Sequence, residues 1–322
     1  MKTLTRRNPR AEAQSLLPAG HEARVLEPSP PANTDPSWFA DDPTDPSGAK
    51  GTVVTPIDGE GVSWEAVASD NSGLRPFITS RWLGDYARLV ALPEGFSDTR
   101  QAMHQLAFFA IAPKRQVATG KIGLRFTYRG FGTPFFGDDE QIRVEDGTLV
   151  YQRKGEASQS SVVTLRHACE FLGTSYWDPW FEGFQDPPPP LGPDRELEAS
   201  SNAAAALGDW FGFGTSVLEQ ARRTEGATDV SRVQLWPEHF DLAFEMGTGE
   251  SRASYGASPG DAAHPDPYLY ISAWEEIDRS EPFWNDSAFN GASFSYRMLL
   301  EAPDQRRAAL EFFDRGFRKL SG

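Results

Sequence analysis

The fold of this chain is indicated most directly by the stretch Val233–Trp274, which reads VQLWPEHFDLAFEMGTGESRASYGASPGDAAHPDPYLYISAW. Apolar residues recur at every second position in several of its segments, which is the period of a strand with one buried face. The turn Ser258–Asp261 has proline and glycine in its two central places, an arrangement that favours a tight turn. The stretch therefore predicts antiparallel strands joined by short turns.

Two segments of this stretch separate their residues into faces. In LWPEHFDLAFEM the even positions within Phe240–Met246 are apolar, whereas His239 and Asp241 share the opposite face. Pro237 cannot donate a hydrogen bond to a neighbouring strand, so we expect an edge or a bulge there. In PYLYISAW aromatic residues lie on one face and aliphatic residues on the other, which suits the wall of a pocket.

The polar face of these strands forms the candidate site. A histidine and a carboxylate two residues apart on a strand can reach one substrate group or one metal ion. We therefore take His239 and Asp241 as the candidate catalytic pair. Further residues around the same predicted mouth form the candidate ligand-binding set: Trp236, Asp261, His264, Tyr268 and Trp274. The competing interpretation is a solvated strand face followed by a turn aspartate, and no metal ligand is assigned.

Four blocks in the last third of the chain resemble the signature of a family of uncharacterised bacterial proteins, catalogued as a domain of unknown function. The blocks are LWPEHFD (Leu235–Asp241), SPGD (Ser258–Asp261), PYLYISAW (Pro267–Trp274) and FNGASFSY (Phe289–Tyr296). In the first half of the chain, only GKI (Gly120–Ile122) resembles the pattern of this family. Family members often have a second histidine where this chain has Glu238, which argues against a two-histidine metal site. The resemblance implies no known activity, but it favours Trp236, His239, Asp241 and Asp261 acting as a unit.

The composition excludes several classes of protein. The chain has 322 residues, of which 39% are hydrophobic and 12% aromatic, enough for a packed core in one large domain or two ordinary ones. Its net charge of -15 disfavours nucleic acid and anionic membranes as partners. No run is long and apolar enough to span a bilayer. The single cysteine, Cys169, excludes internal disulfides and cysteine zinc sites, and a reduced cytoplasmic location follows.

No cofactor is identified from the sequence. The chain contains no HExxH, P-loop or GxSxG motif, and the G-x-G of FGFGTS lies inside a helical pattern. The nature of any protein partner is equally unspecified.

The chain divides into an irregular N-terminal arm (1–72), a first half (73–186), a proline-rich spacer (187–194) and a second half (195–322). Both halves show a helix, several antiparallel strands and a further helix. We therefore predict an α+β fold in which antiparallel sheets are flanked by helices, with two similar halves as a hypothesis. An arm that wraps the folded body is the alternative to a free tail, and a ligand for a module with an aromatic groove is the less favoured alternative for the proline run.

Several individual elements follow from local patterns. RWLGDYARLVAL has helical spacing, and Asp98 is placed to cap a second helix that Pro113 would end. His104, on that helix, is interpreted as a surface or boundary residue. The pair Asp146–Gly147 predicts a two-residue hairpin turn.

Three classes of function remain open. The first is a protein that binds a small molecule in an aromatic-lined pocket, with His239 and Asp241 at its polar end. The second is a hydrolase or isomerase in which His239 is the general base and Asp241 orients it. The third is a structural or interaction module, in which the arm and the proline run contact a partner.

Overall fold

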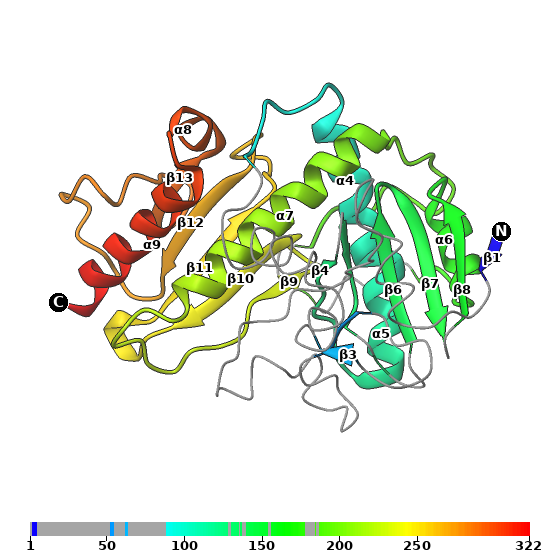
Figure 1. Ribbon diagram of the computed structural model, residues 1–322, viewed down its shortest axis with the longest axis horizontal. Helices are drawn as coiled ribbons and strands as arrows, with labels where there is room; N and C mark the ends of the chain where they lie inside the picture. The colour runs from blue at the N-terminus through cyan, green and yellow to red at the C-terminus, as the bar shows by residue number, and fades with distance from the viewer. Residues whose placement is uncertain are drawn as a thin grey trace.

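The computed structural model describes residues 88–127, 130–134, 136, 140–153, 156–177, 184 and 187–322, together with the backbone of three short strands nearer the N-terminus. Two antiparallel sheets and the helices around them make up the body of the molecule (Figure 1), which confirms the predicted α+β fold class. Apart from the three short strands, the predicted arm (1–72) and residues 73–87 lie outside the described residues.

Within each sheet, strands that follow one another in the sequence are neighbours. The first sheet contains β4 (Arg125–Thr127), β5 (Gly130–Gly132), β6 (Glu140–Glu145), β7 (Thr148–Arg153) and β8 (Glu156–Ser161), with β1 (Lys2–Leu4) at its edge. The second contains β9 (Gln234–Trp236), β10 (Asp241–Met246), β11 (Ala253–Ser258), β12 (Tyr268–Ala273) and β13 (Gly291–Ser295). β2 (Thr52–Val54) and β3 (Val62–Ser63) form a separate pair.

Helices precede and follow each run of strands. Before the first sheet come α4 (Phe96–Leu106), the π-helical turn η3 (Ala107–Ile111) and α5 (Ala112–Thr119), and after it comes α6 (Leu165–Phe171). α7 (Ser201–Ala221) precedes the second sheet, and α8 (Tyr296–Glu301) and α9 (Gln305–Ser321) follow it. The short 3-10 turn η5 (Gly249–Ser251) lies between β10 and β11. The two runs of strands thus share one element order and one strand order, as the hypothesis of two similar halves predicts.

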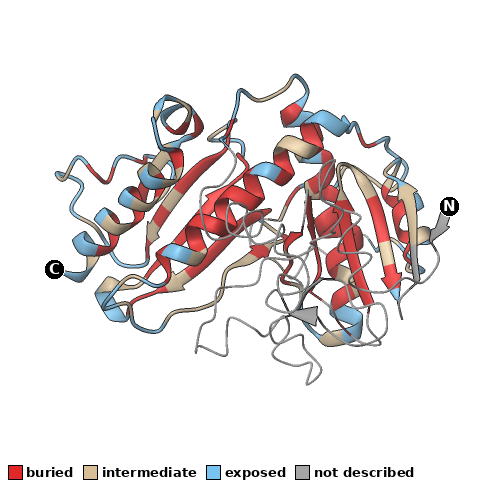
Figure 2. Ribbon diagram, viewed as in Figure 1, coloured by how far each residue is buried: buried red, intermediate tan, exposed pale blue. Residues whose placement is uncertain are grey.

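The two sheets meet at their first strands. Leu124, next to β4, and Leu235 of β9 exchange backbone hydrogen bonds of 2.7 and 2.8 Å. α7 packs against strands of both sheets and forms the centre of the core (Figure 2). Gly214 brings this helix close to the second sheet, because a Cβ there would lie 2.9 Å from the Cβ of Ala257.

The helix that carries His104 is longer than predicted at both ends. Gly95, with φ of 75°, is its N-cap, and Asp98 lies in its first turn rather than at the cap. Pro113 does not end the helix but lies at the start of α5, directly after the π-helical turn. The wider turn changes the hydrogen-bond register where proline cannot donate, so the chain continues as a helix.

The predicted helix in RWLGDYARLVAL is not found in its described part, where residues 88–92 are irregular. The side chain of Gln305 accepts a hydrogen bond from Leu89 N–H at 2.6 Å and donates to the Leu89 carbonyl at 3.0 Å. These contacts satisfy the backbone groups that a helix would otherwise pair.

The proline run that was predicted as a spacer lies against α4. The buried amide of Gln105 donates to the Pro189 carbonyl at 3.0 Å and accepts from Leu191 N–H at 3.1 Å. A run of prolines forms no internal backbone hydrogen bonds, so its carbonyls remain free acceptors and one glutamine can hold the segment in place.

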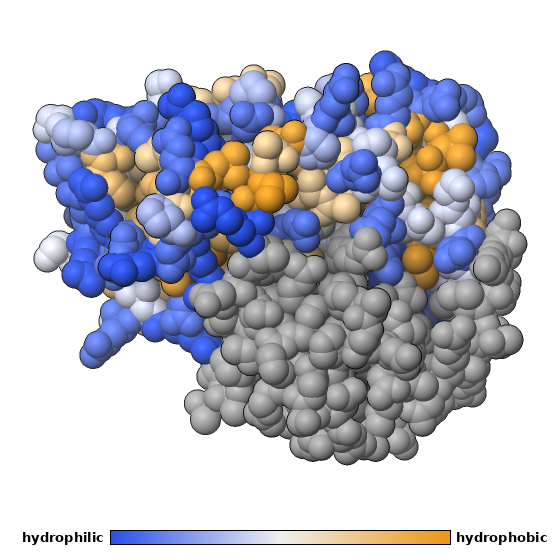
Figure 3. All heavy atoms as spheres, turned by 45° about the horizontal axis from the view of Figure 1, so that its top comes forward, coloured by the Kyte–Doolittle hydropathy of each residue, from blue (hydrophilic) through white to orange (hydrophobic). Residues whose placement is uncertain are grey.

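The surface carries mostly polar side chains. On the face that Figure 3 shows, hydrophilic residues surround separate apolar patches. Exposed large apolar residues of the described ranges are scattered along the chain, among them Val90, Val117, Trp177 and Trp274. None of the helices in these ranges combines the length and the run of apolar residues that crossing a bilayer requires.

Candidate functional site

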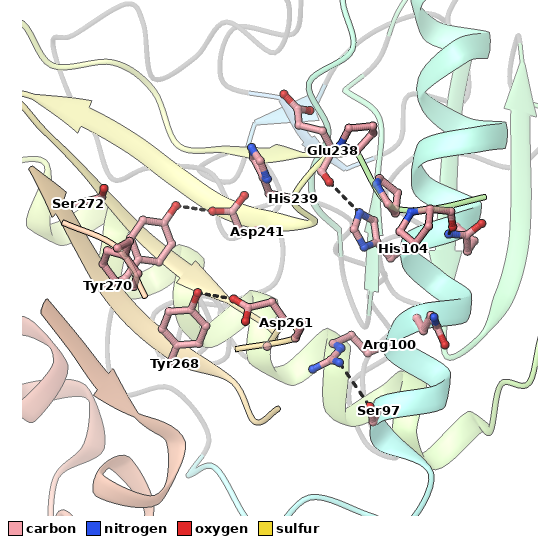
Figure 4. Close-up of a pocket in the computed structure, with 18 residues that line it drawn as sticks. Ser97, Arg100, His104, Glu238, His239, Asp241, Asp261, Tyr268, Tyr270 and Ser272 are labelled. Atoms are coloured by element: carbon pink, nitrogen blue, oxygen red, sulfur yellow. Dashed lines mark hydrogen bonds between the residues drawn. The ribbon is translucent and has the colours of Figure 1, made fainter. Parts of the chain in front are cut away.

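A cavity of about 770 Å3 opens on the polar face of the second sheet (Figure 4). Its walls come from α4, the turn between β9 and β10, the turn after β11, strand β12 and the proline run. The opposite face of the sheet is apolar: Leu242, Tyr255 and Ile271 are fully buried there. The predicted alternation of faces within Asp241–Met246 and within Tyr268–Ala273 is therefore confirmed.

Asp241, the first residue of β10, is the most deeply buried acidic group of the cavity, with 6% of its surface exposed. Its Oδ2 accepts a hydrogen bond from the Tyr270 hydroxyl, whereas its buried Oδ1 has no hydrogen-bond partner in the part of the chain that the structure describes. Burial raises the pKa of Asp241, and the Tyr270 bond and the nearby His239 only partly oppose this effect. Burial and the charge of Asp241 likewise raise the pKa of Tyr270 well above its usual value.

Gly256 allows the Tyr270 ring to reach across the sheet. Tyr270 of β12 is paired with Gly256 of β11, which is in turn paired with Ala243 of β10. A Cβ on Gly256 would lie 2.2 Å from the Tyr270 ring and 2.5 Å from its hydroxyl oxygen. Only glycine at this position leaves room for the ring to cross β11 and contact Asp241.

LWPEHFD forms a hairpin turn and not the continuous strand that we predicted, although β9, which precedes Pro237, is the last strand in the order of its sheet, in line with the edge that was one of the two alternatives predicted there. β9 ends at Trp236, β10 starts at Asp241, and these two residues are paired across the hairpin. Phe240 closes the turn with φ of 56°, and its N–H donates to the Trp236 carbonyl at 2.7 Å. The buried Phe240 ring packs edge-on against Phe131. The ring is anchored in the core, which leaves the preceding His239 exposed at the mouth of the cavity.

His104 of α4 holds this turn in place from a partly buried position, which agrees with its interpretation as a boundary residue. Its Nε2 lies 3.0 Å from the Pro237 carbonyl and 3.1 Å from that of Glu238, and both carbonyls can only accept. The ring stacks on Phe240 with a centroid distance of 5.2 Å. Burial is the main reason that the pKa of His104 falls to about 4, so the ring is neutral with its proton on Nε2.

Asp261 follows the SPGD turn, in which Gly260 has φ of 103°. Its Oδ1 accepts from the N–H groups of Ala263 and His264 at 2.7 and 2.8 Å, and its Oδ2 accepts from the Tyr268 hydroxyl at 2.6 Å. Partial burial works to raise its pKa, but these three hydrogen bonds outweigh burial and hold the pKa below its usual value. Asp261 is therefore ionised and firmly oriented.

Arg100 of α4 supplies the cation in the cavity wall. Its Nη1 donates to the Pro265 carbonyl at 2.6 Å, and its Nη2 donates to Ser97 Oγ at 3.3 Å. Burial lowers its pKa, and the charges of Asp261 and Asp266 oppose that effect. Arg100 thus connects α4 to the loop that carries Asp261.

The structure brings together some of the predicted site residues and separates others. His239, Asp241, Asp261 and Tyr268 all line the cavity. Three predicted ligand-binding residues lie outside its lining: Trp236, His264 and Trp274. His264 supports the loop instead, with Nε2 at 2.9 Å from Oδ2 of the buried Asp286 and its ring 4.3 Å from that of Tyr268.

The two tryptophans are excluded for geometric reasons. Trp236 is the last residue of the edge strand β9, where its pairing with Asp241 places it beside that residue but outside the cavity lining. Trp274 lies beyond the end of β12, where it is 57% exposed and packs against the Arg252 guanidinium at 4.7 Å.

Residues of α4 were missed as site residues. Ser97, Arg100, Gln101, His104 and Gln105 all line the cavity. Their spacing of three and four positions places them on one polar face of the helix. This polar stripe was visible in the sequence, but nothing local indicated which surface it would cover.

In the described part of the chain, no group of three or more histidine, cysteine or acidic residues is arranged to hold a metal ion. The site therefore consists of hydrogen-bonding groups, charges and aromatic rings. Comparison of the chain with protein-family models, curated proteins and solved structures finds no match. The chemistry of the cavity must accordingly be inferred from its own residues.

Proposed function

We propose that this protein binds a small polar molecule in the cavity, with Asp241 as the principal anchor. The observation that carries the proposal is Oδ1 of this buried carboxylate, for which none of the described residues supplies a hydrogen bond. A buried acceptor without a hydrogen bond costs about 1–3 kcal/mol, and more when it is charged. A ligand that donates a hydrogen bond to Oδ1 removes that cost.

The size and lining of the cavity support the same function. Small-molecule sites typically enclose about 300–1,000 Å3 and combine apolar walls with a few oriented polar groups. Here the aromatic rings of Tyr268, Tyr270 and Phe289 stand beside the carboxylates of Asp241 and Asp261. Both tyrosine hydroxyls are bonded to those carboxylates, so the polar groups are fixed before a ligand enters.

Binding is favoured over hydrolase or isomerase chemistry based on His239. A histidine general base needs a partner that fixes its orientation. Asp241 makes its hydrogen bond with Tyr270 rather than with His239, and His239 is exposed. If the site performs proton transfer, Asp241 is the better candidate, because its pKa is raised by burial.

The remaining expectations belong to this proposal as well. A net charge of -15 supports a small molecule rather than nucleic acid as the partner. A cytoplasmic location is consistent with the buried, free thiol of Cys169. Membership of the family with LWPxHFD, SPGD and PYxY blocks stays a prediction.

The proposal is tested by thermal-shift screening of a small-molecule set that contains cationic, neutral and anionic compounds. The variant Ser272→Trp places a large ring into the cavity from β12, on the face opposite the core. Ser321→Trp makes the same change at the exposed end of α9 and serves as the control. Compounds that stabilise the wild-type protein should still stabilise the control but not Ser272→Trp. Equal responses from both variants, or no response from any compound, would contradict the proposal.

A further inference from the structure

We propose that the ligand is an organic cation bearing at least one N–H group, and that this group donates to Oδ1 of Asp241. This inference rests on the proposed small-molecule function and specifies the chemical class. It covers primary and secondary ammonium, amidinium and guanidinium compounds.

The first argument is the balance of charges around the cavity. Among the described residues, its lining contains the carboxyl groups of Glu238, Asp241 and Asp261 and one guanidinium, that of Arg100. Arg100 already donates to backbone carbonyls of the loop and to Ser97, so it does not pair directly with Asp241. A cavity with an excess of carboxylates attracts a positively charged ligand.

The second argument is the state of the two oxygens of Asp241. Oδ2 is occupied by the Tyr270 hydroxyl, whereas Oδ1 is buried and has no hydrogen-bond partner among the described residues. In the ionised carboxylate Oδ1 can only accept, so the missing partner of that form is a donor. A donor that is also positively charged gives the strongest hydrogen bond to a carboxylate.

The third argument is the arrangement of aromatic rings beside this oxygen. The Tyr270 ring lies 6.0 Å from that of Tyr268 and 6.0 Å from that of Phe289, measured between centroids. The three rings line the same cavity as Asp241. Aromatic faces attract cations, and the attraction increases when the cation is removed from water.

An N–H group distinguishes this ligand class from other cations. A quaternary ammonium ion can contact the rings but cannot donate to Oδ1. A metal ion needs several oxygen ligands at once, whereas Oδ2 of Asp241 and Oδ2 of Asp261 already accept tyrosine hydroxyls. Both alternatives therefore leave the buried oxygen poorly satisfied.

Binding should also depend on pH. The groups around Asp241 are His239 and Glu238 from the turn, Asp261 from the next loop, Tyr268 and Tyr270 from β12, and Arg100 and His104 from α4. Because burial favours the protonated form of Asp241, a bound N–H cation must displace that proton. Affinity should rise with pH until Asp241 is fully ionised, and binding below that pH should release protons.

Isothermal titration calorimetry with matched probes tests this inference. The probes are benzylamine, its neutral analogue benzyl alcohol and its quaternary analogue benzyltrimethylammonium, with agmatine and spermidine as larger N–H cations. At least one amine should bind the wild-type protein, and benzyl alcohol and benzyltrimethylammonium should each bind at least about tenfold more weakly than benzylamine. Asp241→Asn should weaken amine binding by about 10- to 100-fold, which is the range expected for a hydrogen bond to a charged group.

The exposed Glu250 provides the control, because Glu250→Gln removes a carboxylate of η5 that does not line the cavity. Amine affinity should be unchanged in this variant. Titrations of the wild-type protein in buffers with different ionisation enthalpies should reveal proton release, a readout that requires no variant.

The outcomes separate this inference from the proposed function. If neutral or anionic compounds bind in a way that Ser272→Trp abolishes, and amines do not, the cavity binds ligands but the cation assignment is wrong. If amines bind with equal affinity to wild type and Asp241→Asn, the assignment is also wrong. If no compound of any charge binds, the proposed function fails together with the inference.

Discussion

His104 should make the protein less stable in mild acid. Because its partly buried ring is removed from much of the solvent, the pKa of His104 falls from the usual 6.5 to about 4, so protonating it in the folded state is unfavourable. At about 1.4 kcal/mol for each unit of pKa difference, the full cost is about 3 kcal/mol. In the unfolded chain the ring binds a proton at its usual pKa. Stability from the neutral ring is therefore present above about pH 6.5 and is lost as the pH falls towards 4.

The most informative variant is His104→Gln. A glutamine amide can still donate to the Pro237 carbonyl, but it does not titrate. Between pH 7.5 and pH 5.0 the wild-type protein should lose about 2 kcal/mol more unfolding free energy than the variant, by the linkage relation applied to the two pKa values. The variant itself will be less stable at pH 7.5 because it loses the stacking on Phe240. The comparison therefore concerns the two pH slopes and not the absolute stabilities.

Urea unfolding followed by tryptophan fluorescence at both pH values measures these slopes, provided that the m-values agree. Asp241 and Asp261 also titrate, but both are present in each protein, so their contributions cancel in the difference to first order. Identical slopes for wild type and His104→Gln would refute the assignment of His104 as a partly buried, neutral donor. A protonated His104 would also disturb the turn that carries His239 and Asp241, so ligand binding should weaken over the same pH range.

Further predictions concern the residues around the buried carboxylate. Asp241→Asn should raise the melting temperature above pH 7. Because the pKa of Asp241 is raised in the folded protein, wild-type stability falls as the pH rises above about 3.8 and the side chain ionises, whereas asparagine does not ionise. A melting temperature at pH 8 that is equal to or lower than that of the wild type would oppose this. Gly256→Ala should destabilise the protein by about 1–3 kcal/mol, because the new Cβ would meet the Tyr270 ring. In a Tyr270→Ala background the cost of Gly256→Ala should be smaller. Chemical denaturation of the four proteins of this double-mutant cycle measures both costs, and equal costs would show that the contact is unimportant. Tyr268→Phe should raise the pKa of Asp261, because one of its stabilising hydrogen bonds is lost; side-chain carboxyl NMR titration measures this, and an unchanged pKa would argue that the backbone N–H groups alone set it.

The parts of the fold that depend on residues close together in the sequence were predictable from it. The Asp146–Gly147 hairpin forms with φ of 49° and 82°, as a two-residue turn with positive φ requires. The alternation in β10 placed Asp241 on the polar face, and Gly260 marked the turn before Asp261. The spacing of apolar residues and the residue types of a turn are local properties of the sequence. These features could therefore be predicted without knowing which distant segments lie together in the fold.

The parts of the site that depend on distant contacts were not predictable. His104 and Pro237 are separated by 133 positions in the sequence, and no local pattern showed that α4 would lie beside the β9–β10 turn. LWPEHFD was interpreted as a strand because its apolar residues alternate, yet Phe240 adopts a positive φ and anchors a turn in the core. The burial of the Phe240 ring compensates for a backbone conformation that the strand pattern did not indicate.

The same reasoning explains why Trp236 and Trp274 do not line the cavity. Both lie at strand ends next to residues of the cavity, so their position in the sequence was a reasonable guide. Their side chains, however, are placed by the edge of the sheet and by Arg252, respectively. Residues at strand ends follow the loops and edges around them more than the alternation of the strand.

The carboxyl carbon of Asp241, observed by NMR, is the most direct test of a ligand site in this cavity. Its resonance should be followed against pH without ligand and with saturating benzylamine, or with agmatine or spermidine if that amine binds more tightly. Without ligand the pKa should be above the usual value because of burial, and the bound amine should lower it, since the cation favours the ionised form. A pKa and a chemical shift that stay unchanged while the amine is shown to bind would place the ligand elsewhere and contradict the role of Asp241 as the anchor.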